Sequence, residues 1–238
     1  MNADPRFSRV ANGRTDLIAD IVKSLGSGPW PEVDGASLLQ WAAYYGDVSA
    51  LKWLRDCGSA LSELGPDLGL NAAAFHGHWQ LCEFLIENGA NARYADATTG
   101  ETPLHSALTN EDRARYDLVA TVLLQAGADT NARTAADAPT GSFMRESRTR
   151  GEAPLHRAAA FGTPATIQLL LDAGANVEQT DCHDDTPLAW ASWYRRPVQV
   201  LRLLLHGEHR IHPACKTMRE NLMGSPSGAG ERDAPPRA

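Results

Sequence analysis

The sequence of 238 residues has only four cysteines, at irregular spacing and without a CxxC pair. This excludes a disulfide framework, and we expect a reducing, cytoplasmic location. Nowhere does an apolar run reach the roughly 18 residues that span a bilayer. The first six residues, MNADPR, also lack the basic and apolar regions of a secretory signal. We therefore expect a protein that does not interact with membranes.

Positive charge is scarce as well. The 22 Lys and Arg residues are outnumbered by 29 Asp and Glu, which gives a formal net charge of −7. This balance disfavours nucleic acid as a partner, because binding to phosphates depends on clustered Lys and Arg. Hydrophobic residues make up 43% of the chain and charged residues 21%, so wholesale disorder is excluded.

The chain does contain five copies of one pattern. The clearest copies are EAPLHRAAAFG at 152–162, ETPLHSAL at 101–108 and DTPLAWA at 185–191, and weaker ones are SLLQWAAYYG at 37–46 and LGLNAAAFHGH at 68–78. A second apolar segment follows each copy and ends near a glycine, at position 58, 89, 127, 174 or 207. The pattern predicts helix pairs whose apolar faces are covered only by neighbouring pairs.

Each copy also has the local signals of a helix start. Ser37, Thr102 and Thr186 are favourable N-caps. Prolines stand where the first helical residue is expected, at Pro103, Pro154 and Pro187. The second copy has Leu68-Gly69 in place of Thr-Pro, so we expect a distorted first turn there.

The pattern resembles the ankyrin repeat, whose signature contains T-P-L-H-x-A-A with a period of about 33 residues. The resemblance covers roughly residues 34–208. It implies an all-α fold, an ankyrin-repeat solenoid of stacked helix-turn-helix units with short β-hairpin loops. It also implies a non-catalytic, monomeric protein that binds another protein without a cofactor. His105 and His156 belong to the signature, where the family uses this histidine for structural hydrogen bonds.

We expect an N-terminal arm and capping helix in residues 1–33, with the helix at Thr15–Leu25, and five repeats in residues 34–208. The repeats are predicted at about 34–66, 67–98, 99–132, 150–182 and 183–208, with a long insert at 133–149. Residues 209–238 are expected to form a short cap, with a helix around 216–222, and a disordered tail.

The repeat period identifies the insert. The five signatures start at Ser37, Leu68, Thr102, Ala153 and Thr186, so successive starts are 31, 34, 51 and 33 residues apart. Four of the extra residues fall around 109–113 and the others between 133 and 150. The segment 133–150 has four Arg and two acidic residues. Its candidate binding residues are Phe143, Arg145, Arg148 and Arg150. Two interpretations stay open: a contact for an acidic or phosphate group, or a solvated loop with Phe143 folded back.

Aromatic residues recur at one phase of the repeat. The two residues before the glycine that ends the signature, or its equivalent, are Tyr44-Tyr45, Phe75-His76, Thr109-Asn110, Ala160-Phe161 and Trp193-Tyr194, so seven of ten are aromatic or His. The resemblance implies that these positions face the concave groove. The candidate binding residues are therefore Tyr44, Tyr45, Phe75, His76, Phe161, Trp193 and Tyr194. Alternatively, the second residue of each pair packs under the hairpin.

Catalytic and metal sites have no support in the sequence. No Ser or Cys lies in a Gly-flanked elbow, and no Gly-rich phosphate loop is present. His76, His78 and Cys82 are close in sequence, but the helical phase predicts that their side chains diverge, so we expect no metal.

The leading hypothesis is a protein-binding module that uses the concave groove, with the Arg-rich insert contributing to selectivity. The alternative is an adaptor or inhibitor that binds an acidic or phosphate-bearing partner mainly through residues 133–150. A modifying enzyme within the irregular third repeat is a third hypothesis.

Overall fold

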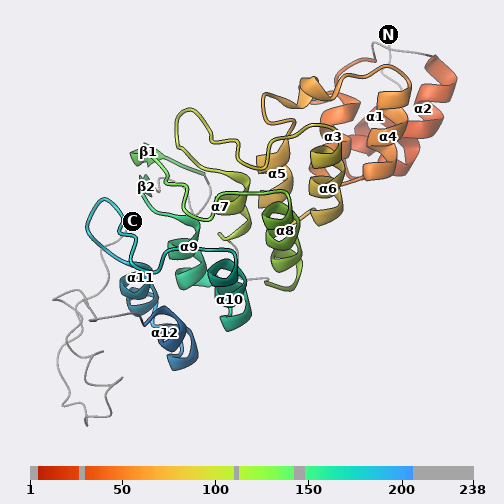
Figure 1. Ribbon diagram of the computed structural model, residues 1–238. Coiled ribbons are helices and arrows are strands. Elements are labelled where there is room, and N and C mark those ends of the chain that lie inside the picture. The colour runs from red at the N-terminus through yellow and green to blue at the C-terminus, as the bar shows by residue number, and fades with distance from the viewer. Residues whose placement is uncertain (1–4, 27–29, 110–112, 142–147, 206–238) are drawn as a thin grey trace. The chain divides into compact units, whose positions relative to one another are not determined.

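The computed structural model describes residues 5–26, 30–109, 113–141 and 148–205. The chain forms two compact units, Met1–Asn91 and Ala92–Ala238. Helices dominate both units, and the two-stranded sheet lies in the second (Figure 1). In the part of the chain described, no helix has both the length and the apolar character needed to cross a bilayer. The helix proposed around 216–222 and the tail lie outside the described residues.

The first unit begins with α1 (Pro5–Ala11), the 3₁₀ helix η1 (Thr15–Leu17) and α2 (Ile18–Leu25). Two helix pairs follow: α3 (Leu38–Tyr44) with α4 (Val48–Asp56), and α5 (Leu70–Phe75) with α6 (Trp79–Glu87). A second 3₁₀ helix, η2 (Leu61–Leu64), connects the pairs. Helix α1 was not among the predicted helices; it contacts α3 and buries Phe7 and Val10.

The second repeat starts as distorted as its sequence predicts. Leu68 and Gly69 both have positive φ, and Gly69 is the N-cap of α5 without a capping side chain. Asp67 replaces the missing Thr, because its carboxylate accepts hydrogen bonds from the backbone N–H of Gly69 at 3.0 Å and of Asn71 at 2.8 Å. A carboxylate two residues upstream thus caps the helix.

The second unit contains three helix pairs among its described residues. They are α7 (Pro103–Ala107) with α8 (Arg113–Gln125), α9 (Pro154–Phe161) with α10 (Pro164–Asp172), and α11 (Pro187–Trp193) with α12 (Val198–Leu204). In both units we call the first helix of a pair the inner helix and the second the outer helix. The predicted N-caps Ser37, Thr102 and Thr186 are confirmed, since each side chain accepts a backbone hydrogen bond.

The insert forms an extended hairpin. Strands β1 (Ala136–Pro139) and β2 (Arg148–Arg150) are antiparallel, with Ala136 opposite Arg150 and Pro139 opposite Arg148. Backbone hydrogen bonds connect the hairpin to its neighbours: Ala135 N–H donates to Thr99 O at 2.7 Å, and Cys182 N–H donates to Arg150 O at 2.7 Å. The hairpins of successive repeats in this unit are therefore joined edge to edge.

Candidate functional site

The inner helices of the first unit end in a cluster of aromatic rings, which we call the first-unit ring cluster: Trp41, Tyr44, Tyr45, Phe75 and His76. Tyr44 is 52% exposed, and Tyr45 and Phe75 are each 37% exposed. The ring centroids of Tyr44 and Tyr45 are 5.0 Å apart, and those of Tyr44 and His76 are also 5.0 Å apart. His76 in turn contacts Phe75 at 5.3 Å. Large apolar rings from two repeats thus form one continuous exposed surface.

Hydrogen bonds hold this cluster in place. The Tyr45 hydroxyl donates to Ala11 O at 2.7 Å, which ties the end of α3 to α1. His78 Nε2 donates to Tyr44 O at 3.0 Å and links the two repeats. Gly46, at φ +72°, permits this approach, because a Cβ there would lie only 2.6 Å from the His78 ring. The Tyr45 side chain and the backbone of Tyr44 are therefore held by hydrogen bonds within the chain.

The predicted divergence of His76 and His78 is wrong. Their rings are nearly parallel, with centroids 5.8 Å apart. The reason is local: His76 is the C-cap of α5 and His78 is the N-cap of α6, with only Gly77 between them. Partial burial, followed by the charge of His78, lowers the pKa of His76. Cys82 is buried, and among the described residues no group of three His, Cys, Asp or Glu could hold a metal ion.

The ring residues of the second unit have a different setting. Tyr194 is 49% exposed, and its ring centroid lies 5.1 Å from that of Phe161. Burial of part of the ring raises the pKa of the Tyr194 hydroxyl. Trp193 is half-buried at the end of α11. The structure thus brings Phe161 and Tyr194 together at the ends of adjacent inner helices.

Two arginines of the segment 133–150, Arg148 and Arg150, form ion pairs within the chain. Arg150 Nε lies 3.1 Å from Asp181 Oδ2, and its Nη2 lies 3.1 Å from Asp185 Oδ2. Its guanidinium also lies over the rings of Trp190 and Trp193. Arg148 Nη1 forms an exposed ion pair with Asp137 at 3.3 Å. Phe143 and Arg145 lie outside the described residues.

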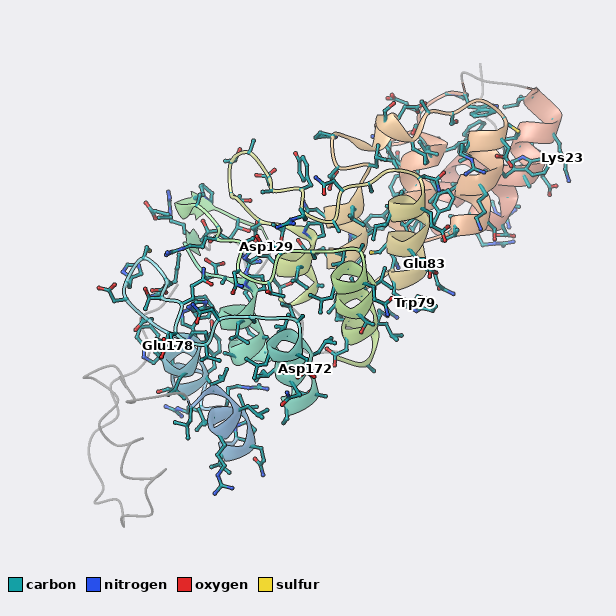
Figure 2. All side chains as sticks on the ribbon, viewed as in Figure 1. Lys23, Trp79, Glu83, Asp129, Asp172 and Glu178 are labelled. Carbon is teal, nitrogen blue, oxygen red and sulfur yellow. The ribbon has the colours of Figure 1, made fainter. Side chains whose placement is uncertain are left out.

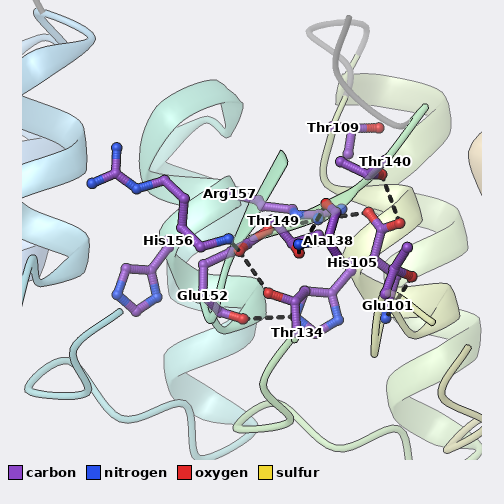
Figure 3. A network of polar contacts seen from close by, with 12 residues as sticks. Glu101, His105, Thr109, Thr134, Ala138, Thr140, Thr149, Glu152, His156 and Arg157 are labelled. Atoms are coloured by element: carbon purple, nitrogen blue, oxygen red, sulfur yellow. Dashed lines mark hydrogen bonds and ion pairs between the residues drawn. The ribbon is translucent and has the colours of Figure 1, made fainter. Parts of the chain in front are cut away.

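Beneath the insert lies a buried network that the sequence analysis missed (Figure 3). Arg157 on α9 is fully buried, and its Nη2 contacts Glu101 Oε1 and Glu152 Oε1, both at 2.6 Å. The carboxylates also accept hydrogen bonds from the stem of the insert. Thr134 Oγ1 donates to Glu152 Oε2 and Thr140 Oγ1 donates to Glu101 Oε2, each at 2.7 Å. One guanidinium thus joins two repeats and the inserted hairpin.

The charge of Arg157 sets the ionisation of its neighbours. Burial alone would raise the pKa of Glu152, but the positive charge of Arg157 and hydrogen bonds from Thr134 and from the Arg150 N–H lower it to about 2. Burial and then the charge of Arg157 lower the pKa of His105 to about 3. The network therefore contains a carboxylate that stays ionised and an imidazole that stays neutral.

The two signature histidines are structural, as the resemblance implies. His105 Nδ1 accepts from Thr102 N–H at 3.2 Å, and its Nε2 donates to Glu152 O at 3.2 Å. His156 Nδ1 accepts from Ala153 N–H at 3.1 Å, and its Nε2 donates to Asp185 O at 3.1 Å. Each neutral ring thus links its own helix start to the next repeat.

A signal for the network was present in the sequence. An acidic residue stands directly before the signature in three repeats, as Glu101, Glu152 and Asp185, and all three are buried. Arg157 occupies the variable position of the signature, where most repeats have a smaller or uncharged residue. Buried carboxylates require a nearby cation, so this combination could have indicated the pairing.

The helix pairs, the prolines at the first helical position and the bridging histidines define a repeat protein of the ankyrin class. The chain belongs to this family: the family model described as ankyrin repeats (3 copies) matches residues 39–134 and 139–216. The ankyrin fold is a non-catalytic interaction fold, and the chain is a protein-protein interaction module.

Several curated proteins are similar to the chain. Palmitoyltransferase ZDHHC13 of Mus musculus is 25% identical over 181 residues, which is 68% of this chain and 29% of that protein. The B-cell lymphoma 3 protein homolog of Mus musculus is 29% identical over 193 residues, covering 79% of this chain and 39% of that protein. Rabankyrin-5 of Homo sapiens is 33% identical over 114 residues, covering 47% and 9%. The chain spans less than half the length of each of these relatives.

Proposed function

We propose that the chain binds a partner protein at the aromatic ends of its inner helices, with the insert contributing to selectivity. The observation that carries this proposal is the exposure of the first-unit ring cluster, where Tyr44 is 52% exposed beside other rings. A contiguous set of exposed rings in a folded protein is typical of an interaction surface.

The energetics favour this surface as an anchor. Tyr and Trp bury a large area for few rotatable bonds, so they dominate the hot spots of interfaces. The rings also contact one another, and the Tyr45 hydroxyl is bonded to Ala11 O. Because this hydrogen bond already holds the Tyr45 side chain, less conformational entropy is lost at this ring when a partner docks. Phe161, Trp193 and Tyr194 form a separate proposed surface within the second unit.

The insert has a supporting part in the proposal. Thr140 and Thr149 are buried, and Thr149 Oγ1 accepts a hydrogen bond from Ala138 N–H at 3.1 Å. This bond joins the two strands, and the bond from Thr140 Oγ1 to Glu101 Oε2 anchors the stem to the third repeat. The alternative, in which an acidic or phosphate-bearing partner binds mainly at residues 133–150, has less support, since Arg148 and Arg150 already have carboxylate partners.

Affinity capture from lysate with mass spectrometry tests the two sites. One variant combines Tyr44→Ala, Phe75→Ala and Tyr194→Ala, and a second lacks residues 142–147 but keeps Thr140 and Thr149. The matched control is Trp53→Ala, which removes a ring of 40% exposure from the outer helix α4. Circular dichroism first establishes that each variant is folded.

We expect the ring variant to lose a specific partner that wild type and Trp53→Ala both retain. Loss with the deletion alone would assign recognition to the insert and favour the alternative. If wild type captures no protein above background, the binding proposal itself is wrong.

A further inference from the structure

The fifth repeat contains an arginine-binding site that the chain fills itself. The guanidinium of Arg150 lies 5.7 Å from the ring centroid of Trp190 and 5.3 Å from that of Trp193. Asp181 and Asp185 pair with the same guanidinium, and their side chains are only 0% and 1% exposed. Aromatic faces and carboxylates together suit a planar cation, which stacks and forms hydrogen bonds at once.

The first repeat has aromatic residues at the same positions of its inner helix. Counted from the N-caps Ser37 and Thr186, the residues Trp41, Tyr44 and Tyr45 occupy the positions of Trp190, Trp193 and Tyr194. The first and last rings of each set of three also match in geometry. Trp41 and Tyr45 stack with centroids 6.1 Å apart at 23°, and Trp190 and Tyr194 stack with centroids 6.4 Å apart at 26°.

An acidic residue stands at the same sequence position before the rings in both repeats. Glu32 stands at the position of Asp181, and Asp34 follows two residues later. The Trp41 indole N–H donates to Val33 O at 3.0 Å, so the ring is held against the turn between these two residues. Glu32 and Asp34 are exposed, whereas Asp181 and Asp185 are buried beside Arg150.

The first unit uses its own cations elsewhere. Lys23 lies 5.6 Å from the Trp53 ring centroid, and Lys52 and Arg55 each lie 5.6 Å from that of Phe84, all three over rings of outer helices. Among the described residues, no Lys or Arg lies over Trp41, Tyr44 or Tyr45. Residues 5–91 contain ten Asp and Glu but six Lys and Arg. The described first unit therefore carries an excess of negative charge, which complements a basic partner.

We propose that the first repeat binds an arginine side chain of the partner protein over Trp41 and Tyr44, paired with Glu32, as the fifth repeat binds Arg150. This inference rests on the proposed function, because it specifies the chemistry of the segment that docks on the same rings. At the first repeat the guanidinium would come from the partner protein, whereas at the fifth repeat it comes from Arg150 of the chain itself.

The test starts from an array of random 12-residue peptides incubated with the full chain. Peptides that bind wild type but not Tyr44→Ala are resynthesised with each Arg replaced by citrulline, a neutral side chain of the same shape. We expect one citrulline replacement to weaken binding at least about fivefold. Glu32→Gln should weaken the Arg peptide to a similar extent and leave the citrulline peptide unaffected.

The control variant is Glu83→Gln, an equal change of charge on the outer helix α6 (Figure 2), which should leave both peptides bound as before. The citrulline peptides could bind wild type as tightly as the Arg peptides and still lose binding to Tyr44→Ala. In that case the arginine inference is wrong, while binding through the rings stands. If no peptide depends on Tyr44, the inference and the proposed function both fail.

Discussion

The two units differ in the kinds of side chain that are buried inside each of them. Every buried polar or charged side chain that we find among the described residues lies in the second unit, from Glu101 to Ser192. The buried side chains of the first unit are apolar, such as Leu51, Leu54 and Leu85. The second unit thus contains buried charges, whereas the described buried side chains of the first unit carry none. Ionisation should therefore affect the stability of the second unit more than that of the first.

Removal of Arg157 gives the strongest test of this contrast. Arg157→Ala leaves Glu101 and Glu152 facing each other without their cation in a buried site, so we expect a loss of about 3–5 kcal/mol in the free energy of unfolding. Urea denaturation measures the loss. Hydrogen exchange should place it in residues 92–205, with the exchange of residues 5–91 unchanged.

A triple variant provides the control. Arg157→Met combined with Glu101→Gln and Glu152→Gln removes all three charges, so it should recover much of the stability that Arg157→Ala loses. A loss below about 1 kcal/mol for Arg157→Ala would mean that the network contributes no more than a solvent-exposed ion pair. It would contradict the proposal that buried charges stabilise the second unit.

The second prediction concerns the anchor of the insert. Arg150→Ala should lower the free energy of unfolding by about 2–4 kcal/mol, because the buried carboxylates of Asp181 and Asp185 lose their cation. Arg148→Ala is the matched control, and we expect a change within about 0.5 kcal/mol because its ion pair is exposed. Equal effects of the two substitutions in urea denaturation would refute the distinction.

Acid should destabilise the second unit more than the first. The folded pKa of His105, about 3, lies below the ordinary value of about 6.5. The unfolded chain therefore binds more protons in this window, and stability is lost as pH falls from about 6.5 to 3 at about 1.4 kcal/mol per pH unit. Burial also lowers the pKa of His156, so protonation of His156 destabilises the fold in the same direction. The lowered pKa of Glu152 contributes a further loss of stability once the pH falls below 4.5, the ordinary pKa of this carboxyl group.

Hydrogen exchange at pH 7 and pH 4.5 can check this difference. His76 in the first unit also has a lowered pKa, through partial burial and the charge of His78, so a smaller loss with the same sign is expected there. A greater loss of protection in residues 5–91 than in 92–205 would contradict the prediction.

The smallest effect is expected at the hydrogen bond between Tyr45 and Ala11. Tyr45→Phe removes only the hydroxyl, so we expect a loss of about 1 kcal/mol in the free energy of unfolding of the first unit. Tyr44→Phe is the control, since Tyr44 is the more exposed ring and should have little effect on stability. Thermal denaturation of the two variants provides the comparison.

Much of the fold could be predicted because its signals are local. N-caps such as Thr102, prolines at the first helical position and terminal glycines depend on a few neighbouring residues. The positions of the exposed rings also followed from the repeat phase. By contrast, the pairing of Arg157 with Glu101 joins residues 56 positions apart, across an insertion whose path the periodicity does not determine. The partners of Arg150 were also missed, because Asp181 and Asp185 lie 31 and 35 residues further along the chain.

The anchored stem of the insert has a consequence for chain entropy. Pro139 is paired with Arg148, so only the eight residues 140–147 lie between paired positions of the two strands. The entropic cost of closing a loop grows only with the logarithm of its length, and doubling the length costs about 0.6 kcal/mol. Because the ion network anchors the stem, the stability of the second unit should depend only weakly on the length of this segment. Evolution or an engineer could lengthen the loop or graft a foreign sequence there while the repeats on either side stay in register.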